Sequence, residues 1–162
     1  MLRIGLLSDT HAYWDDRYIE HFEACDEIWH AGDIGSLAVI ERLSSAKTLR
    51  AVHGNIDGHE IRSFCPSHLR FMIEGVDVWI THIGGYPGKY AHEIRNAIYA
   101  NPPQLFICGH SHILKVMFDK RLNCLHINPG AAGKQGLHAV RTLIRFSIEG
   151  KEIKDLEVIE LA

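Results

Sequence analysis

The sequence predicts an α/β fold in which two mixed β-sheets pack together and helices cover their outer faces. In the first half of the chain, short apolar runs alternate with amphipathic segments, which is typical of strands separated by helices. The second half contains mostly apolar runs separated by turn residues. Two sheets with outer helices bury both patterns, and 162 residues suffice to enclose such a core in a single domain spanning residues 1–162.

The elements expected in the first half follow from apolar runs and capping residues. We expect strands at residues 2–8, 27–31 and 49–53. Asp15 or Asp16 can cap a helix that runs to about residue 24, with Ile19 and Phe22 turned inward. Ser36 can cap a second helix that runs through residue 43, and residues 54–66 are expected to form a loop and a short helix.

The second half is expected to be richer in strands. Residues 69–74 and 76–81 closely flank Gly75 and predict a β-hairpin. A helix at residues 89–100 places one apolar face inward, and Asn101-Pro102-Pro103 ends it. The residues of that face are Tyr90, Ala91, Ile94, Ala97 and Ile98. Further strands are expected at residues 104–108, 113–118, 122–127, 143–148 and 152–159.

Composition and charge exclude several classes of protein. A net charge of -3 argues against a general nucleic-acid binder, and no apolar run reaches the length of a membrane span. The N-terminus enters a strand without the charged and apolar regions of a signal peptide, so a cytoplasmic location is expected. The four cysteines form no Cys-x-x-Cys pair and lie beside apolar residues, which favours buried free thiols over disulfides or zinc ligands.

Five short polar motifs each follow an apolar run. They are Asp9-Thr10-His11, Gly32-Asp33, Gly54-Asn55-Ile56-Asp57, Thr81-His82 and Gly109-His110-Ser111-His112. Because strand ends in α/β sheets converge on a common crevice, we expect their side chains to meet. Carboxylate, amide and imidazole groups are typical ligands of divalent metal ions. The sequence therefore predicts a metal centre built from Asp9, His11, Asp33, Asn55, His82, His110 and His112.

The spacing of these residues suits two metal ions. Asp9 and His11 lie two residues apart on an extended segment and can point to the same side. Asp33 has two carboxylate oxygens and can bridge two ions, which gives each ion four protein ligands. Each residue alone has a simpler explanation, since an Asp at a strand end is often a helix cap and a His among apolar residues usually belongs to the core. The order of all five motifs favours the metal centre.

Four segments resemble the motifs of the calcineurin-like metallophosphoesterase superfamily, in particular its small bacterial and archaeal phosphodiesterase branch. They are Ser8-Asp9-Thr10-His11, His30-Ala31-Gly32-Asp33, Gly109-His110-Ser111-His112 and Asn128-Pro129-Gly130. The resemblance covers Ile4 to about Ala132 and implies a four-layer α/β sandwich with a dinuclear site. It implies that Asp9, His11, Asp33 and His112 bind the first metal, and that Asp33, Asn55, His82 and His110 bind the second.

The resemblance also gives catalytic roles to Asp33, Asn55 and His110 and favours manganese. The donor set itself suits manganese, iron, zinc, cobalt or nickel. Two divalent ions with two carboxylates and one hydroxide leave a charge of roughly +1, which attracts a phosphate ester. We therefore hypothesise that a hydroxide bridging the two metals attacks phosphorus, with a small or nucleotide-like phosphate ester as substrate.

Three functions remain open at this point. The first is a metal-dependent phosphodiesterase, and the second is a phosphomonoesterase, because the same centre can serve both reactions. The third is a non-catalytic scaffold for protein interactions, as in a retromer subunit of the same fold, although in that lineage the ligands are degraded. The aromatic residues Tyr13, Trp14 and Phe71 could belong to the core or to a subunit contact, so a homo-oligomer is compatible with the sequence.

The chain departs from the family pattern at two places. Larger family members have a proton-donating histidine where this chain has Ile56, so substrates with good leaving groups should react best. Ile83 follows His82 and precedes a glycine-rich insert, residues 84–88, which could be a flap that brings Tyr86 or Tyr90 to the substrate, or a plain surface loop.

Several neighbouring polar residues have two interpretations each. Asp57 could fix a neighbouring loop or cap a helix, and His30 and His53 could support the ligands or belong to the core. Asn128 lies in a turn whose amides could face the site, although turn formation alone is the preferred interpretation, and His138 belongs to no motif.

Overall fold

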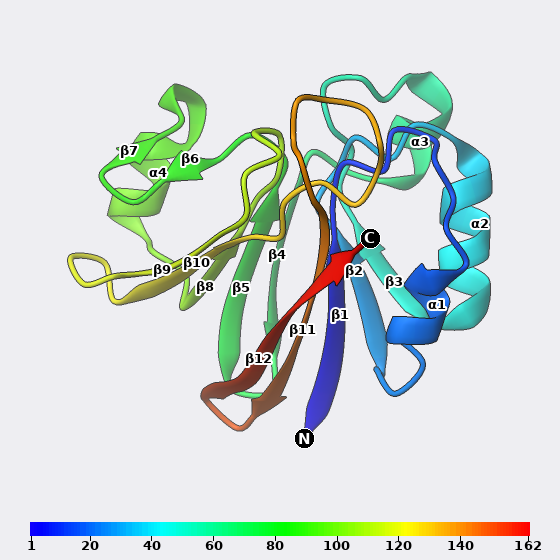
Figure 1. Ribbon diagram of the computed structural model, residues 1–162. Helices are drawn as coiled ribbons and strands as arrows, with labels where there is room; N and C mark the ends of the chain where they lie inside the picture. The colour runs from blue at the N-terminus through cyan, green and yellow to red at the C-terminus, as the bar shows by residue number, and fades with distance from the viewer.

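The computed structural model describes residues 1–162 and contains two five-stranded sheets that pack face to face (Figure 1). The first sheet has the order β12-β11-β1-β2-β3 and the second the order β4-β5-β8-β10-β9. The strands of the first sheet are β1 (Leu2–Leu7), β2 (Glu27–His30), β3 (Thr48–Ala51), β11 (Arg141–Glu149) and β12 (Glu152–Leu161). Those of the second are β4 (His68–Ile73), β5 (Val76–Thr81), β8 (Leu105–Ile107), β9 (Lys115–Asp119) and β10 (Cys124–Asn128).

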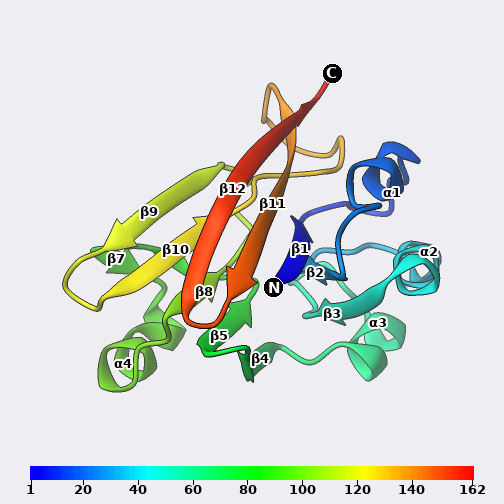
Figure 2. The same cartoon turned by 90° about the horizontal axis from the view of Figure 1, so that it is seen from below.

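Helices cover the outer face of each sheet, which gives the four predicted layers (Figure 2). The helices α1 (Arg17–His21), α2 (Leu37–Ala46) and α3 (His59–Phe64) lie beside the first sheet, and α4 (His92–Ala100) lies beside the second. No helix has both the length and the apolar character that a membrane span requires.

Three apolar clusters hold these layers together, and alternation along the strands sorts residues between them. On β5, Val78 and Ile80 face the other sheet, whereas Trp79 between them faces α4. On β1, Leu6 enters the cluster between the sheets and Leu7 enters the cluster under α1 and α2. This is the period-two pattern of a strand buried on both faces. The four cysteines are buried free thiols, as predicted.

Most predicted elements are present, with shifted ends. The helix expected to reach residue 24 ends at His21. Asp16 and Ser36 do not cap their helices through the side chain, whereas Asp15 Oδ1 accepts the amide of Arg17 at 3.0 Å. The strand expected from residue 113 begins at Lys115, since the amide of Ile113 donates to Ser111 Oγ at 3.2 Å and stays in the preceding loop. The β4–β5 hairpin around Gly75 is confirmed.

The prediction of a helix at residues 89–100 was wrong at its start. Residues 85–90 instead form a small hairpin of β6 (Gly85–Tyr86) and β7 (Lys89–Tyr90), and the helix begins at His92. Ala91 has an extended backbone, and its amide donates to the carbonyl of Gly84 at 2.9 Å, which closes the hairpin. Ala97 was also expected to face inward but is exposed, because α4 buries only Ile94 and Ile98.

Candidate metal centre

The loops that follow β1, β2, β3, β5 and β8 gather at one end of the sandwich, the upper end in Figure 1. Backbone hydrogen bonds tie these loops together. The amide of Asp9 donates to the carbonyl of Gly32 at 2.9 Å, and that of Gly109 donates to His82 at 2.9 Å. Side chains that are distant in sequence therefore meet at this end, and they include all seven residues of the predicted centre.

One group of potential ligands consists of Asp9, His11 and His112. Asp9 Oδ1 lies 3.1 Å from His112 Nε2 and 3.8 Å from His11 Nε2. The other oxygen of this buried carboxylate accepts hydrogen bonds from Ser8 Oγ at 2.6 Å and from the His110 amide at 3.1 Å. These bonds hold Asp9 in place, and only Oδ1 is left to face the histidines.

A second group consists of Asp33, His82 and His110. Asp33 Oδ2 lies 3.1 Å from His82 Nε2 and 3.5 Å from His11 Nε2 of the first group. Asp33 Oδ1 accepts a hydrogen bond from the amide of Ile56 at 3.0 Å. The same oxygen of Asp33 therefore faces both groups, whereas the sequence suggested that its two oxygens would be divided between two ions.

Asn55 joins the second group through His110. Its Oδ1 lies 3.0 Å from His110 Nδ1. Asn55 and His110 are both exposed, whereas Asp9, Asp33 and His82 are buried. The centre is therefore buried on the side of the two carboxylates and open to solvent at Asn55 and His110, where a ligand can enter.

The donor atoms fit divalent cations. The carbonyl of Ala31 lies 2.7 Å from His82 Nδ1 and can only accept, so Nδ1 carries the proton and the lone pair of Nε2 faces Asp33 in the neutral ring. The Nε2 atoms of His11 and His82 are both buried without a hydrogen-bond partner. Buried polar atoms of this kind need a partner, and a cation between imidazole nitrogen and carboxylate oxygen supplies one.

The charges of the site also favour a cation. Burial opposes ionisation of Asp9, but the imidazoles of His11 and His112 outweigh burial and hold the pKa of Asp9 well below its ordinary value. The pKa of Asp33 is lowered too, since His82 and the Ile56 amide outweigh its burial. The neighbouring Asp9 carboxylate raises the pKa of His11. Burial alone would lower the pKa of His82, yet Asp33 and Asp9 raise it. Both carboxylates therefore stay ionised and attract positive charge.

The backbone is unusual at most of the candidate ligands. Five of them have a left-handed backbone, namely Asp9 (φ 54°), His11 (φ 45°), Asp33 (φ 55°), His110 (φ 71°) and His112 (φ 63°). Only a few per cent of residues other than glycine adopt this conformation, although Asp and His tolerate it better than most. Gly54 permits the close packing, because a Cβ at this position would overlap with the Asp33 carboxylate. These loops turn sharply to bring side chains to one point.

Two polar residues behind the ligands fix the loops. Asp57 accepts the amides of Gly54 at 2.8 Å, Gly35 at 2.9 Å and Ile34 at 3.1 Å, so it joins the loops after β2 and β3 and does not cap α3. For Asn128, turn formation alone was the preferred interpretation. Its amide donates to the carbonyl of Gly109 at 2.9 Å and to Ser111 Oγ at 3.1 Å, so it also supports the loop that carries His110.

The histidines next to the motifs divide between support and core. His30 accepts the Gly32 amide at Nδ1 and lies 3.0 Å from Thr10 Oγ1 through Nε2, so it braces two ligand loops. Burial lowers the pKa of His30 to about 4, which keeps its ring neutral. His53 donates to the carbonyl of Cys65 at 2.8 Å, away from the ligands.

Sequence reasoning missed Ser8 and His138. Ser8 could have been found, since it directly precedes Asp9, whose carboxylate accepts its hydroxyl. His138 lies in the loop before β11, with its ring 5.2 Å from that of His112, and its Nε2 donates to the carbonyl of Gly133 at 2.8 Å. No motif or apolar run marks His138, because it reaches the site through a long loop.

The sequence profile of the calcineurin-like phosphoesterase superfamily domain matches residues 2–151. The chain belongs to this superfamily. Its members are metal-dependent hydrolases of phosphate esters, which agrees with the two groups of potential ligands. A probable metallophosphoesterase of Methanothermobacter thermautotrophicus is 27% identical over 163 residues, which cover 96% of this chain and 91% of the relative.

Two solved structures are similar to this chain over nearly its whole length. An archaeal phosphodiesterase is 25% identical, with a TM-score of 0.75, and the match covers 99% of this chain and 100% of that one. Vps29 of Entamoeba histolytica, solved as a complex with Zn²⁺, is 14% identical with a TM-score of 0.75 and coverage of 99% and 98%. The second likeness concerns the fold alone.

Proposed function

We propose that this chain is a dinuclear metal-dependent phosphodiesterase whose ligands are the seven residues named above. One observation carries the proposal: Asp33 Oδ2 lies within 3.5 Å of a histidine nitrogen of each group. A carboxylate oxygen in this position would be able to contact each of two neighbouring cations. Similarity to the archaeal phosphodiesterase supports the preference for diesters.

Asp9, His11, Asp33 and His112 would hold one ion, and Asp33, Asn55, His82 and His110 would hold the other. The donors are oxygen and nitrogen without thiolate, which suits manganese and also iron, zinc, cobalt or nickel. We infer manganese. Divalent ions in such a site acidify water and neutralise the charge of the phosphoryl oxygens.

The protein's own residues prepare the site for this chemistry. The two carboxylates stay ionised and fix the positions of the cations, while the open side at Asn55 and His110 admits the ester. Ser8 and Ile56 bind the outer oxygens of the carboxylates and prevent them from turning away. Ile56 cannot donate a proton to the leaving group, so we expect a preference for esters with good leaving groups.

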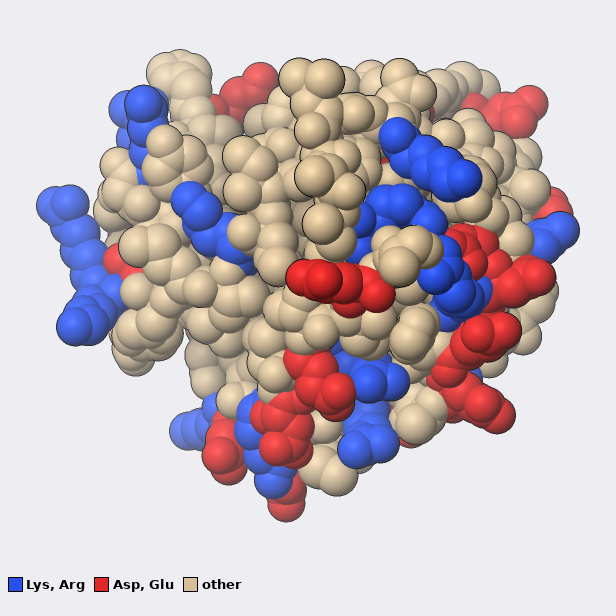
Figure 3. Space-filling model, viewed as in Figure 1, with Lys and Arg blue, Asp and Glu red and all other residues tan.

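The substrate is expected to be a small, soluble ester. The face in Figure 3 mixes lysine and arginine with aspartate and glutamate and presents no continuous basic surface. Long nucleic acids need such a surface for their backbone phosphates. A small phosphodiester, whose single charge is met by the centre, does not need such a surface.

Two alternatives use the same fold. A phosphomonoesterase would share the whole centre. A protein-interaction scaffold is favoured by the apolar edge strand β9, where Val116, Met117 and Phe118 are exposed, and by the shared fold of Vps29. The full set of seven coordinating side chains argues for an enzyme.

The test combines metal analysis with hydrolysis. Protein incubated with Mn²⁺ and freed of excess metal should hold about two ions and cleave bis(p-nitrophenyl) phosphate faster than p-nitrophenyl phosphate. Asp33→Asn should lose both ions and activity, whereas Asp16→Asn changes an exposed carboxylate and should lose neither. Faster cleavage of the monoester supports the phosphomonoesterase, and full occupancy with no cleavage supports the scaffold.

A further inference from the structure

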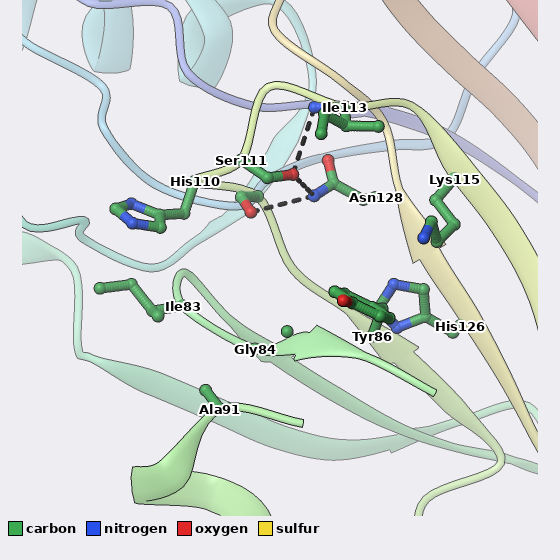
Figure 4. A pocket seen from close by; sticks show the side chains of 12 residues that line it. Ile83, Gly84, Tyr86, Ala91, His110, Ser111, Ile113, Lys115, His126 and Asn128 are labelled. Carbon is green, nitrogen blue, oxygen red and sulfur yellow. Dashed lines mark hydrogen bonds between the residues drawn. The ribbon is translucent and has the colours of Figure 1, made fainter. Parts of the chain in front are cut away.

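A pocket of about 230 Å³ adjoins the metal centre. It shares Gly109, His110 and Ser111 with the loop that carries two of the candidate ligands, and it extends from there to the β6–β7 hairpin and to strands β9 and β10. In Figure 4, His110 lies at one side of the pocket, and Tyr86, Lys115 and His126 lie at the other. A group attached to a phosphate at the centre can therefore reach into this pocket.

The β6–β7 hairpin is held firmly against the sheet and forms one wall. A Cβ at Gly84 would overlap with Phe106 on β8 and with Cys108 directly after it, so the glycine lets the hairpin lie directly on the sheet. The hydroxyl of Tyr90 donates to Asp119 Oδ2 at 2.6 Å, which ties the hairpin to the end of β9. Tyr90 is thus a buried structural residue, and Tyr86 is the aromatic residue that reaches the pocket.

His126 gives the pocket an unused polar group. Its side chain lies on β10, is 1% exposed, and neither ring nitrogen has a hydrogen-bond partner within the protein. Burial lowers the pKa of His126 to about 4, so the ring is neutral and offers one donor and one acceptor. Buried polar groups are seldom left without partners, and this one faces a pocket that a ligand can enter.

The other lining residues define the chemistry of a ligand. Ile83, Tyr86 and Ile113 are apolar or aromatic and remain exposed. Lys115 is the one lysine or arginine among the lining residues, and its Nζ lies 4.2 Å from the centroid of the Tyr86 ring. No carboxylate lines the pocket. Apolar walls with a few polar groups at fixed positions are typical of sites for flat organic groups.

A second hollow flanks the other side of the centre, and three of its polar side chains already form hydrogen bonds within the protein. Arg62 donates to the carbonyl of Asp57 at 2.6 Å, His53 to that of Cys65 at 2.8 Å, and His68 accepts from Trp79 at 3.2 Å. Among the buried side chains that line the two hollows, His126 is the one outside the candidate ligands whose ring nitrogens both lack a partner.

We propose that this pocket binds one ester group of the substrate and that it selects a planar aromatic or heteroaromatic ring with hydrogen-bonding atoms on its edge. Tyr86 and Ile113 contact the faces of the ring, His126 hydrogen-bonds to its edge, and Lys115 attracts an electron-rich substituent. The inference rests on the proposed phosphodiesterase, because the metal centre must hold the phosphate.

The kinetic test compares two diesters with the same leaving group, phenyl p-nitrophenyl phosphate and methyl p-nitrophenyl phosphate. Manganese-loaded wild-type protein should prefer the phenyl ester in kcat/KM by about tenfold or more, as an apolar pocket discriminates a missing group. His126→Phe keeps an aromatic ring beside Phe106 but removes both nitrogens, so it should abolish any preference for a ring with nitrogen on its edge, such as a pyridyl over a phenyl ester. Tyr86→Ala should reduce the phenyl preference itself.

A matched pair of lysine variants separates the pocket from general surface charge. Lys115→Met should lower the preference for a nitro-substituted over an unsubstituted phenyl ester, whereas Lys120→Met, in the exposed turn after β9, should leave it unchanged. Equal kcat/KM for phenyl and methyl esters in the wild type, or an unchanged preference in both Tyr86→Ala and His126→Phe, would overturn the inference.

A binding measurement keeps the two proposals distinguishable. Pyridylphosphonate and methylphosphonate are added to the Zn²⁺-loaded protein, and the ring resonances of His126 are followed by nuclear magnetic resonance. Only the pyridyl compound should shift them. If no diester is cleaved but this shift occurs, the pocket stands and the phosphodiesterase fails. If diesters are cleaved but neither compound shifts His126, the pocket assignment fails.

Discussion

Asn55 Oδ1 and His110 Nδ1 lie 3.0 Å apart, although the two residues follow strands of different sheets. Asn55 extends the loop after β3, and His110 extends the loop after β8. The contact therefore bridges the two halves of the sandwich at the open side of the metal centre. Two donor atoms at this separation can bind one ion, or share a proton when no ion is bound.

Removal of the amide should weaken the second metal position selectively. In Asn55→Ala we expect the affinity for one of two metal ions to fall by at least about tenfold, with a corresponding loss of diesterase activity. Titration calorimetry with Mn²⁺ resolves the two sites. Asn96→Ala, on the exposed face of α4, serves as the control. An equal loss of affinity at both metal sites would show that Asn55 is not a ligand of one ion alone.

Asp57 should matter for stability as well as for metal binding. In Asp57→Asn one oxygen replaces two, so at least one of the three backbone amides it now accepts is left unpaired. We expect a loss of about 1–3 kcal/mol in the free energy of unfolding and a 10–100-fold loss of metal affinity. Urea denaturation without metal measures the first effect. The exposed Asp155→Asn should change neither quantity, and a wild-type unfolding free energy in Asp57→Asn would contradict the assignment.

Metal affinity should fall in acid. The pKa values of His11 and His82 are raised above 6.5 in the metal-free protein, and an imidazole must lose its proton to bind a metal. Metal affinity should therefore decline once the pH falls below these pKa values, which lie above 6.5, by about tenfold per pH unit for each proton released. Metal content after equilibration at pH 5 to 8 tests this, and full occupancy at pH 5 would contradict it. His82→Asn should flatten the dependence, whereas the exposed His59→Asn should not.

The metal-free protein should lose stability in acid through its buried neutral histidines. Burial lowers the pKa of His126 to about 4, from the 6.5 of an unfolded chain. In mild acid the unfolded state binds a proton at His126 that the folded state does not bind. The contribution of His126 to the free energy of unfolding is therefore complete above pH 6.5 and is lost as the pH falls toward 4. Between pH 7 and 5, His126→Phe should lose about 2 kcal/mol less than the wild type. Chemical denaturation measures both free energies of unfolding. If they change equally with pH in the wild type and in His126→Phe, His126 is solvated in the folded protein.

A histidine at position 56 should restore proton donation. Ile56 is exposed at the open side of the centre, next to Asn55, and its amide already bonds to Asp33. Ile56→His should raise the rate for esters with poor leaving groups by about 10²-fold and leave good leaving groups nearly unchanged. Rates across a series of substituted phenyl esters measure the sensitivity. Ile56→Phe tests for a purely steric effect, and an unaltered sensitivity in Ile56→His would oppose the explanation.

The sequence was most informative where residues with metal-binding side chains directly follow an apolar run. Each of the seven candidate ligands comes within five residues of the end of a strand, so strand positions alone place them at one end of the sandwich. Two packed sheets with outer helices could be predicted because continuous apolar runs mark strands that are buried on both faces, and the family resemblance implied the four layers. That the whole chain forms one domain and is located in the cytoplasm remain predictions.

What the sequence did not indicate depends on tertiary contacts. Tyr90 has the spacing of a helical residue, but its hydrogen bond to Asp119 belongs to a hairpin that local propensity does not reveal. His126 alternates with apolar residues along β10 and looks like any core residue until the pocket beside it is seen. His138 reaches the centre through a loop without a motif.

The left-handed backbone at Asp9, His11, Asp33, His110 and His112 has a consequence for anyone who wishes to transplant this centre into another scaffold. Each such residue is disfavoured by about 1–2 kcal/mol relative to a right-handed one, and the surrounding loops compensate through their own hydrogen bonds. Copying the seven side chains onto regular strands and helices would reproduce the metal-binding groups, but these groups would point in different directions. A successful graft must carry over the loops, with Ser8, Asp57 and Asn128 that hold them.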